Sequence, residues 1–103
     1  MHPANEVITL SGEEAIEVLK ELEVILISLH RIGSYYVDKN VNDYQKETTR
    51  FIDEWKVTHK LANARMILTK KFDSTLGEDN MDDLERAMED LSYWTPPKKI
   101  SIT

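Results

Sequence analysis

The stretch SGEEAIEVLKELEVILISLHRIGSYY, residues 11–36, decides the fold class because its apolar residues recur every three or four positions. Ser11 and Glu14 have the spacing of a capping box, in which each side chain satisfies a backbone amide at a helix start. The seam behind them consists of Ala15, Val18, Leu22, Ile25, Leu29, Ile32 and Tyr36. This spacing is typical of a helix packed lengthwise on another helix, and it predicts a helix over 12–38.

The next stretch, residues 42–72, contains neither glycine nor proline. Asn40 or Asn42 can cap its start. Apolar residues again recur at helical spacing, so the sequence predicts one uninterrupted helix over 42–72. The short connection before it predicts that the two helices are antiparallel neighbours.

A third, shorter helix is predicted over 80–94. Gly77 interrupts the preceding pattern, Asn80 can cap a new start, and Pro96 disfavours helical geometry at the residue before it. The tail 95–103 and the stretch EVITL near the start have short alternating patterns, so the termini are expected to be irregular or short and β-like.

These elements predict a single all-α domain over 1–103: a long antiparallel hairpin plus a shorter third helix. The third helix can cover only one end of the hairpin, and Leu19 and Leu26 turn toward it. Val24 and Ile27 point away from both neighbours, so we expect them to contact a second chain, most simply in a two-fold dimer.

Composition narrows the class of partner. There are 13 Lys and Arg against 19 Asp and Glu, a net charge of -6 that opposes binding to nucleic acid and favours a basic protein. With no cysteine the chain has no disulfide and no thiolate metal site, which fits a cytoplasmic protein. The longest apolar run, Val24 to Ile27, is too short to span a membrane.

The hairpin end that lacks a third helix carries five of the eight aromatic residues. They are Tyr35, Tyr36, Tyr44, Phe51 and Trp55. Aromatic residues dominate the energetic centres of interfaces, so they form either the local core or a partner surface. The third helix is acidic, and the acids expected to contact a basic partner are Asp82, Asp83, Glu85, Glu89 and Asp90.

Two short motifs suggest other functions. Residues 30–34, HRIGS, resemble the histidine phosphotransfer motif, which implies a phosphorelay protein that uses His30. The acids Glu13, Glu14 and Glu17 resemble the helix that holds magnesium in MazG-type all-α nucleotide pyrophosphohydrolases, although acids in the first turn are also expected from the helix dipole.

There is no His-Glu-x-x-His motif and no glycine-rich phosphate loop. We therefore predict a non-enzymatic protein-binding module without metal or cofactor. In size, charge and lack of cysteine it resembles immunity proteins, antitoxins and phage or bacterial adaptors that neutralise a basic partner.

Overall fold

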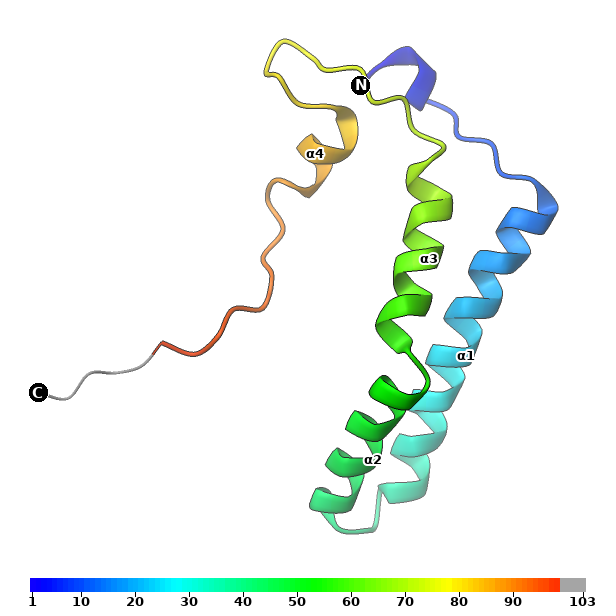
Figure 1. Ribbon diagram of the computed structural model, residues 1–103, viewed down its shortest axis with the longest axis vertical. Helices are drawn as coiled ribbons and strands as arrows, with labels where there is room; N and C mark the ends of the chain where they lie inside the picture. The colour runs from blue at the N-terminus through cyan, green and yellow to red at the C-terminus, as the bar shows by residue number, and fades with distance from the viewer. Residues whose placement is uncertain (99–103) are drawn as a thin grey trace, which may run out of the picture.

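The computed structural model describes residues 1–98 as a long helical hairpin with a short helix standing off one end (Figure 1). The elements are η1 (Pro3–Asn5), α1 (Gly12–Tyr36), α2 (Val41–Glu54), α3 (Val57–Thr69) and α4 (Asp83–Met88). No strand occurs within residues 1–98, so the predicted all-α hairpin is confirmed. The expectation for residues 99–103 lies outside the described part of the chain.

The helix starts follow the capping signals of the sequence. The Ser11 hydroxyl accepts from the Glu14 amide at 3.1 Å, and the Glu14 carboxylate accepts from the Ser11 amide at 3.0 Å. The side chain of Asn40, one of the two predicted caps, accepts from the Asn42 amide and starts α2. The first helix ends at Tyr36, two residues before its predicted end.

The prediction of one continuous helix over 42–72 is wrong. α2 ends at Glu54 and α3 begins at Val57, because Lys56 adopts the left-handed conformation with φ 51° and ψ 50°. In an unbroken helix Ala64 would lie roughly 140° around the axis from Phe51. The break corrects this phase difference, so that both residues are buried in the hairpin.

The hairpin core is thin. Its buried apolar residues are Val18, Ile25, Phe51, Val57 and Ala64. Phe51 is the most enclosed of them at 3% exposure, and it clusters with Ile25, Val57 and the half-buried Ile32. Two helices that share one seam can bury little more than this, so most of their apolar surface needs cover from elsewhere.

The third predicted helix is much shorter than the expected 80–94. Asn80 lies in a turn with φ 61°, and Asp82 caps α4 instead by accepting from the Glu85 amide at 2.8 Å. The prediction that this third helix covers α1 is also wrong. The extensive helix packing involves α1, α2 and α3 only, and Leu19 and Leu26 are exposed.

The molecule is flat and extended. Its radius of gyration is 19.0 Å, against about 13 Å for a compact domain of this length. Its extents are 52 × 52 × 20 Å, so it is less than half as thick as it is long or wide. Within residues 1–98, none of the helices is long and apolar enough to cross a membrane.

The break between α2 and α3 can be tested at Lys56. A left-handed L-residue costs about 1–2 kcal/mol, which glycine avoids. We expect Lys56→Gly to raise the free energy of unfolding by about 0.5–1 kcal/mol, after the greater freedom of glycine in the unfolded chain is subtracted. The measurement is urea denaturation followed by circular dichroism. Lys60→Gly, inside α3, is the matched control and should lower stability by about 1 kcal/mol; equal effects would contradict the role of Lys56.

Candidate protein-binding surfaces

One hydrogen bond defines the two faces of the hairpin. Glu17 precedes the buried Val18, Asn63 precedes the buried Ala64, and the Asn63 amide donates to the Glu17 carboxylate at 3.2 Å. Residues that precede a buried position on α1 and α3 therefore lie on a shared polar face. Because successive helical residues turn by about 100°, residues that follow a buried position lie on the opposite face.

That opposite face is apolar, and we call it the open face. Each of its members lies one or four positions after a buried residue, and they are Leu19, Leu22, Leu26, Leu29, Ile52, Trp55, Leu61 and Leu68. Between 38% and 61% of each of these residues is exposed. An apolar surface that runs along both arms of a hairpin is typical of a protein-binding site.

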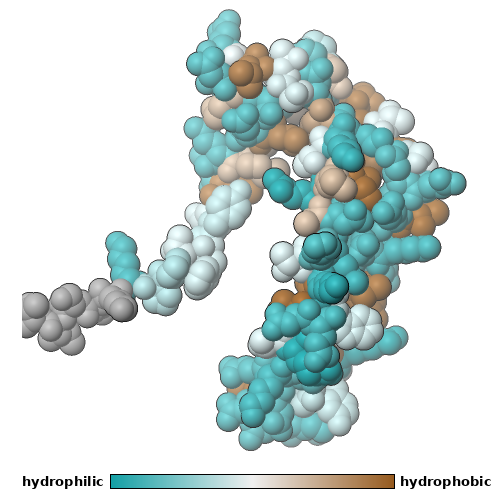
Figure 2. Space-filling view, viewed as in Figure 1, coloured by the Kyte–Doolittle hydropathy of each residue, from teal (hydrophilic) through white to brown (hydrophobic). Residues whose placement is uncertain are grey.

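A groove separates α3 from α4 and the segment that follows it. It has a volume of about 950 Å³, and its apolar lining is Leu68, Phe72, Leu84, Met88, Leu91 and Tyr93. Asp82 and Glu85 lie along the α4 side and Arg65 along the α3 side. In Figure 2 hydrophobic surface gathers in this upper part of the molecule, whereas the visible side of α2 is largely hydrophilic.

The position of α4 is set by hydrogen bonds to residues near the N-terminus. Asn5 is 3% exposed and pairs with the backbone of Asp73 in both directions, donating at 3.0 Å and accepting at 2.7 Å. Its amide nitrogen also lies 2.7 Å from the carboxylate of Asp83, which accepts from the His2 amide at 2.9 Å. These bonds lower the pKa of Asp83. We call this set, Asn5 with Asp73 and Asp83, the polar clasp.

The turn before α4 is held by Arg86. Its guanidinium pairs with Asp79 at 2.7 Å and with Asp83 at 2.9 Å, and it donates to the carbonyl of Met81 at 3.1 Å. The hydrogen bonds from Arg86 are the main cause that lowers the pKa of Asp79 to about 2. Asp79 and Asp83 therefore serve the fold of this segment.

The aromatic residues predicted to meet a partner are divided among different surroundings. Phe51 is buried and packs against Trp55 at 5.7 Å between ring centroids, so it belongs to the core. Trp55 and Tyr44 are exposed, while Tyr36 is half-buried and contacts the exposed Tyr35 edge-on at 4.8 Å. Desolvation by burial has the largest effect on the pKa of Tyr36 and raises it, and the negative charge of Glu47 raises it further.

Val24 and Ile27, the predicted contact with a second chain, are 36% and 39% exposed. Both lie away from the open face: Val24 precedes the buried Ile25, and Ile27, two positions after Ile25, lies roughly opposite it on the helix. Among the predicted acids, Asp82 caps α4 and Asp83 belongs to the polar clasp. The remaining three, Glu85, Glu89 and Asp90, are exposed.

The residues of the two enzyme-like motifs do not converge. His30 is exposed on α1. Glu14 pairs with Lys71 at 2.6 Å, and Glu17 binds Asn63. Across residues 1–98, no group of three His, Cys, Asp or Glu residues is placed to hold a metal ion.

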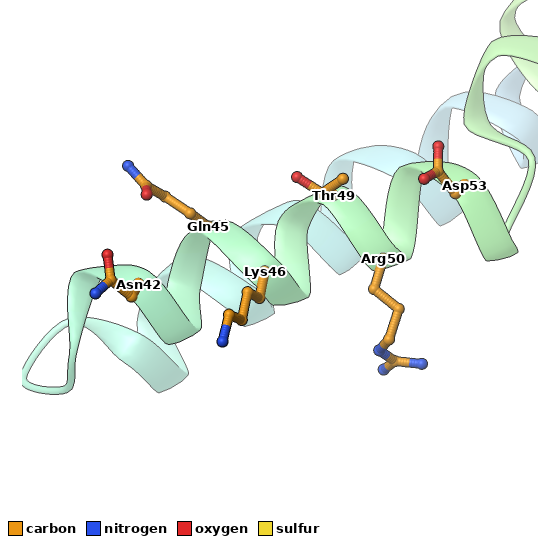
Figure 3. Close-up of a pocket in the computed structure, with 6 residues that line it drawn as sticks. All are labelled: Asn42, Gln45, Lys46, Thr49, Arg50 and Asp53. Carbon is orange, nitrogen blue, oxygen red and sulfur yellow. The ribbon is translucent and has the colours of Figure 1, made fainter.

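A polar depression lies on the surface of α2. Its lining residues, Asn42, Gln45, Lys46, Thr49, Arg50 and Asp53, all come from one helix. Figure 3 shows their side chains pointing away from one another, with Gln45 and Thr49 on one side of the helix and Lys46 and Arg50 on the other. Arg50 is engaged by Glu47 and by Glu54, and these partners raise its pKa.

Comparisons with models of protein families, with curated proteins and with solved structures gave no match.

The sequence did not predict the open face, because the leucines of that face were assigned to neighbours within the chain. Leu22 and Leu29 were placed in the hairpin seam, and Leu19 and Leu26 were placed under the third helix. The available signal was a second series on α1, displaced by one residue from Val18, Ile25 and Ile32. Two adjacent seams on one helix indicate two packing partners.

The polar clasp predicts a local effect of Asn5→Ala. Loss of this buried side chain leaves backbone groups of Asp73 without partners, so the free energy of unfolding should fall by about 1–3 kcal/mol. Amide hydrogen exchange should accelerate at residues 73–90 and remain unchanged in α1. Asn63→Ala, which removes one exposed bond, is the control and should change stability by less than about 0.5 kcal/mol. Uniform acceleration over the whole chain would contradict a local clasp.

Glu14 predicts a pH dependence of stability. The hydrogen bond from Lys71 makes the largest contribution to lowering the pKa of Glu14 from 4.5 to about 2. A carboxyl group with a lowered pKa stabilises the fold above its unfolded pKa, and that stabilisation is lost as the pH falls. Glu14→Gln should therefore be less stable than wild type at pH 7, and the difference should vanish between pH 4.5 and about 2. Urea denaturation across that range measures it, with Glu13→Gln as control; parallel curves would refute the role of the pair.

Proposed function

We propose that this chain is a non-enzymatic protein-binding module that receives a basic, amphipathic helix of another protein in the groove between α3 and α4. The observation that carries the proposal is the combination, in one place, of apolar walls and an acidic helix. Such a groove is complementary to a helix with one apolar face and a cationic face.

The apolar residues that line the groove support the proposed contact with the apolar face of a helix. Leu68 and Phe72 line it from α3 and the turn after it, and Leu84 and Met88 line it from α4. The last two residues are one helical turn apart, so they form a continuous wall. An incoming helix would bury its own apolar residues against both walls.

The charge of the segment supports a basic partner. Residues 78–90 contain seven acids and one arginine. Within residues 1–98, the carboxylates of Glu85, Glu89 and Asp90 form no hydrogen bond or ion pair with the chain. Opposite charge steers encounter and selects against acidic partners. These properties suit a protein that neutralises a basic partner by covering its cationic surface.

The test uses a synthetic helical peptide with leucines on one face and lysines on the other. We expect it to bind the full chain and to shift the NMR signals of Leu84 and Met88. The same peptide with glutamates in place of lysines should not bind. Glu85→Lys with Glu89→Lys should weaken binding by about tenfold at low salt, and the difference should shrink as salt screens the charges.

The matched control for charge is Asp38→Lys with Asp53→Lys, which changes the net charge equally at exposed sites far from the groove. It should leave peptide affinity within about twofold of wild type. Equal weakening by both pairs, or binding of the glutamate peptide, would show that the groove has no specificity for a basic helix.

A further inference from the structure

We infer that the open face is the interface between two copies of this chain, with their α1 helices packed antiparallel across a two-fold axis. This inference rests on α1, which contributes no residue to the groove, and the open face and the groove lining share one residue, Leu68. It does not depend on the proposed function.

The first observation is the seam that α1 leaves uncovered. Its positions, spaced alternately by four and three, are Ala15, Leu19, Leu22, Leu26, Leu29 and Gly33. This is the heptad pattern of a coiled coil. The hairpin uses a different seam, that of Val18, Ile25 and Ile32, so the heptad seam remains available for a second helix.

The seam is symmetric about position 24. Leu22 and Leu26 are equidistant from it, as are Leu19 and Leu29, and the small residues Ala15 and Gly33 occupy the two ends. In an isologous interface, residue i of one copy meets residue j of the other and the reverse contact also forms. Antiparallel α1 helices centred on position 24 therefore place leucine on leucine and small residue on small residue.

The antiparallel arrangement also accounts for the rest of the open face. A two-fold axis perpendicular to α1 keeps the other arms of both hairpins on the same side of the α1 pair. Ile52, Trp55 and Leu61 then face the second hairpin as well, and the four helical arms form a bundle of two layers. Parallel α1 helices would place those arms on opposite sides and leave these residues uncovered.

The exposed area is large enough for such an interface. A folded monomer of this mass exposes roughly 6,000 Å². This chain exposes 8913 Å², and part of the excess comes from the extended segment after α4. A stable interface needs only about 800 Å² from each partner. No charged residue lies within the seam, and Glu23 flanks it on the outer edge, where its carboxylate can remain in solvent.

Cysteine cross-linking tests the register, since the chain contains no cysteine of its own. Leu19→Cys and Leu29→Cys chains, one of them isotope-labelled, are mixed and oxidised. We expect disulfide-linked heterodimers by mass spectrometry and no dimers from either variant alone. Two copies of position 19 would lie roughly 15 Å apart, beyond the reach of about 7 Å that a disulfide allows. Cross-linking of Leu19→Cys with itself would overturn the antiparallel arrangement.

Light scattering tests the dimer itself. The full chain should have twice the chain mass at micromolar concentration. Leu22→Glu with Leu26→Glu should raise the dissociation constant by at least about 100-fold. Val24→Glu with Ile27→Glu is the matched control on the other side of α1 and should leave the mass unchanged. A monomeric wild type, or dissociation by the control pair only, would overturn the inference. Peptide binding by a monomeric wild type would leave the proposed function intact.

Discussion

Two helices lying side by side can share only one seam, and the open face and the break in the second arm of this hairpin follow from that limit. The seam buries Val18 and Ile25 of α1 against Phe51, Val57 and Ala64 of the opposite arm. A layer one helix thick has two large faces, and a soluble hairpin can make both of them polar. Here one face is polar and the other carries leucines, so the apolar pattern of α1 exceeds what the hairpin itself can use.

The break at Lys56 follows from the same limit. With a single seam, the second arm must keep its buried residues in line with α1 over its full length. Phe51 and Ala64 do not share a side of a straight helix, so an uninterrupted arm would direct one of them into solvent. The left-handed residue restores the alignment at a local conformational cost. Burial of Val57 and Ala64 offsets this cost. The break also places Leu61 and Leu68 on the same face as Leu22 and Leu29.

The sequence predicted what depends on local signals. The capping box of Ser11 and Glu14, the length of α1 and the antiparallel hairpin follow from caps, periodicity and a short connection. It did not predict the break at Lys56, because neither glycine nor proline marks that position. It also overestimated α4, since residues with helical spacing after Met88 have no surface to pack against. The open face was hidden because periodicity shows which residues are buried together, but not which neighbour buries them.

The groove has a different physical origin from the open face. α4 has no buried residue, and its position is set by the polar clasp of Asn5 with Asp73 and Asp83 and by the ion pairs of Arg86. Hydrogen bonds of this kind fix direction without filling space, so an apolar groove remains between α3 and α4. Because the hairpin core takes no part in this contact, the width of the groove can change without any cost in core packing. Under the proposed function, a groove of this kind would suit helices that differ in the size of their apolar side chains, and charge would select among them.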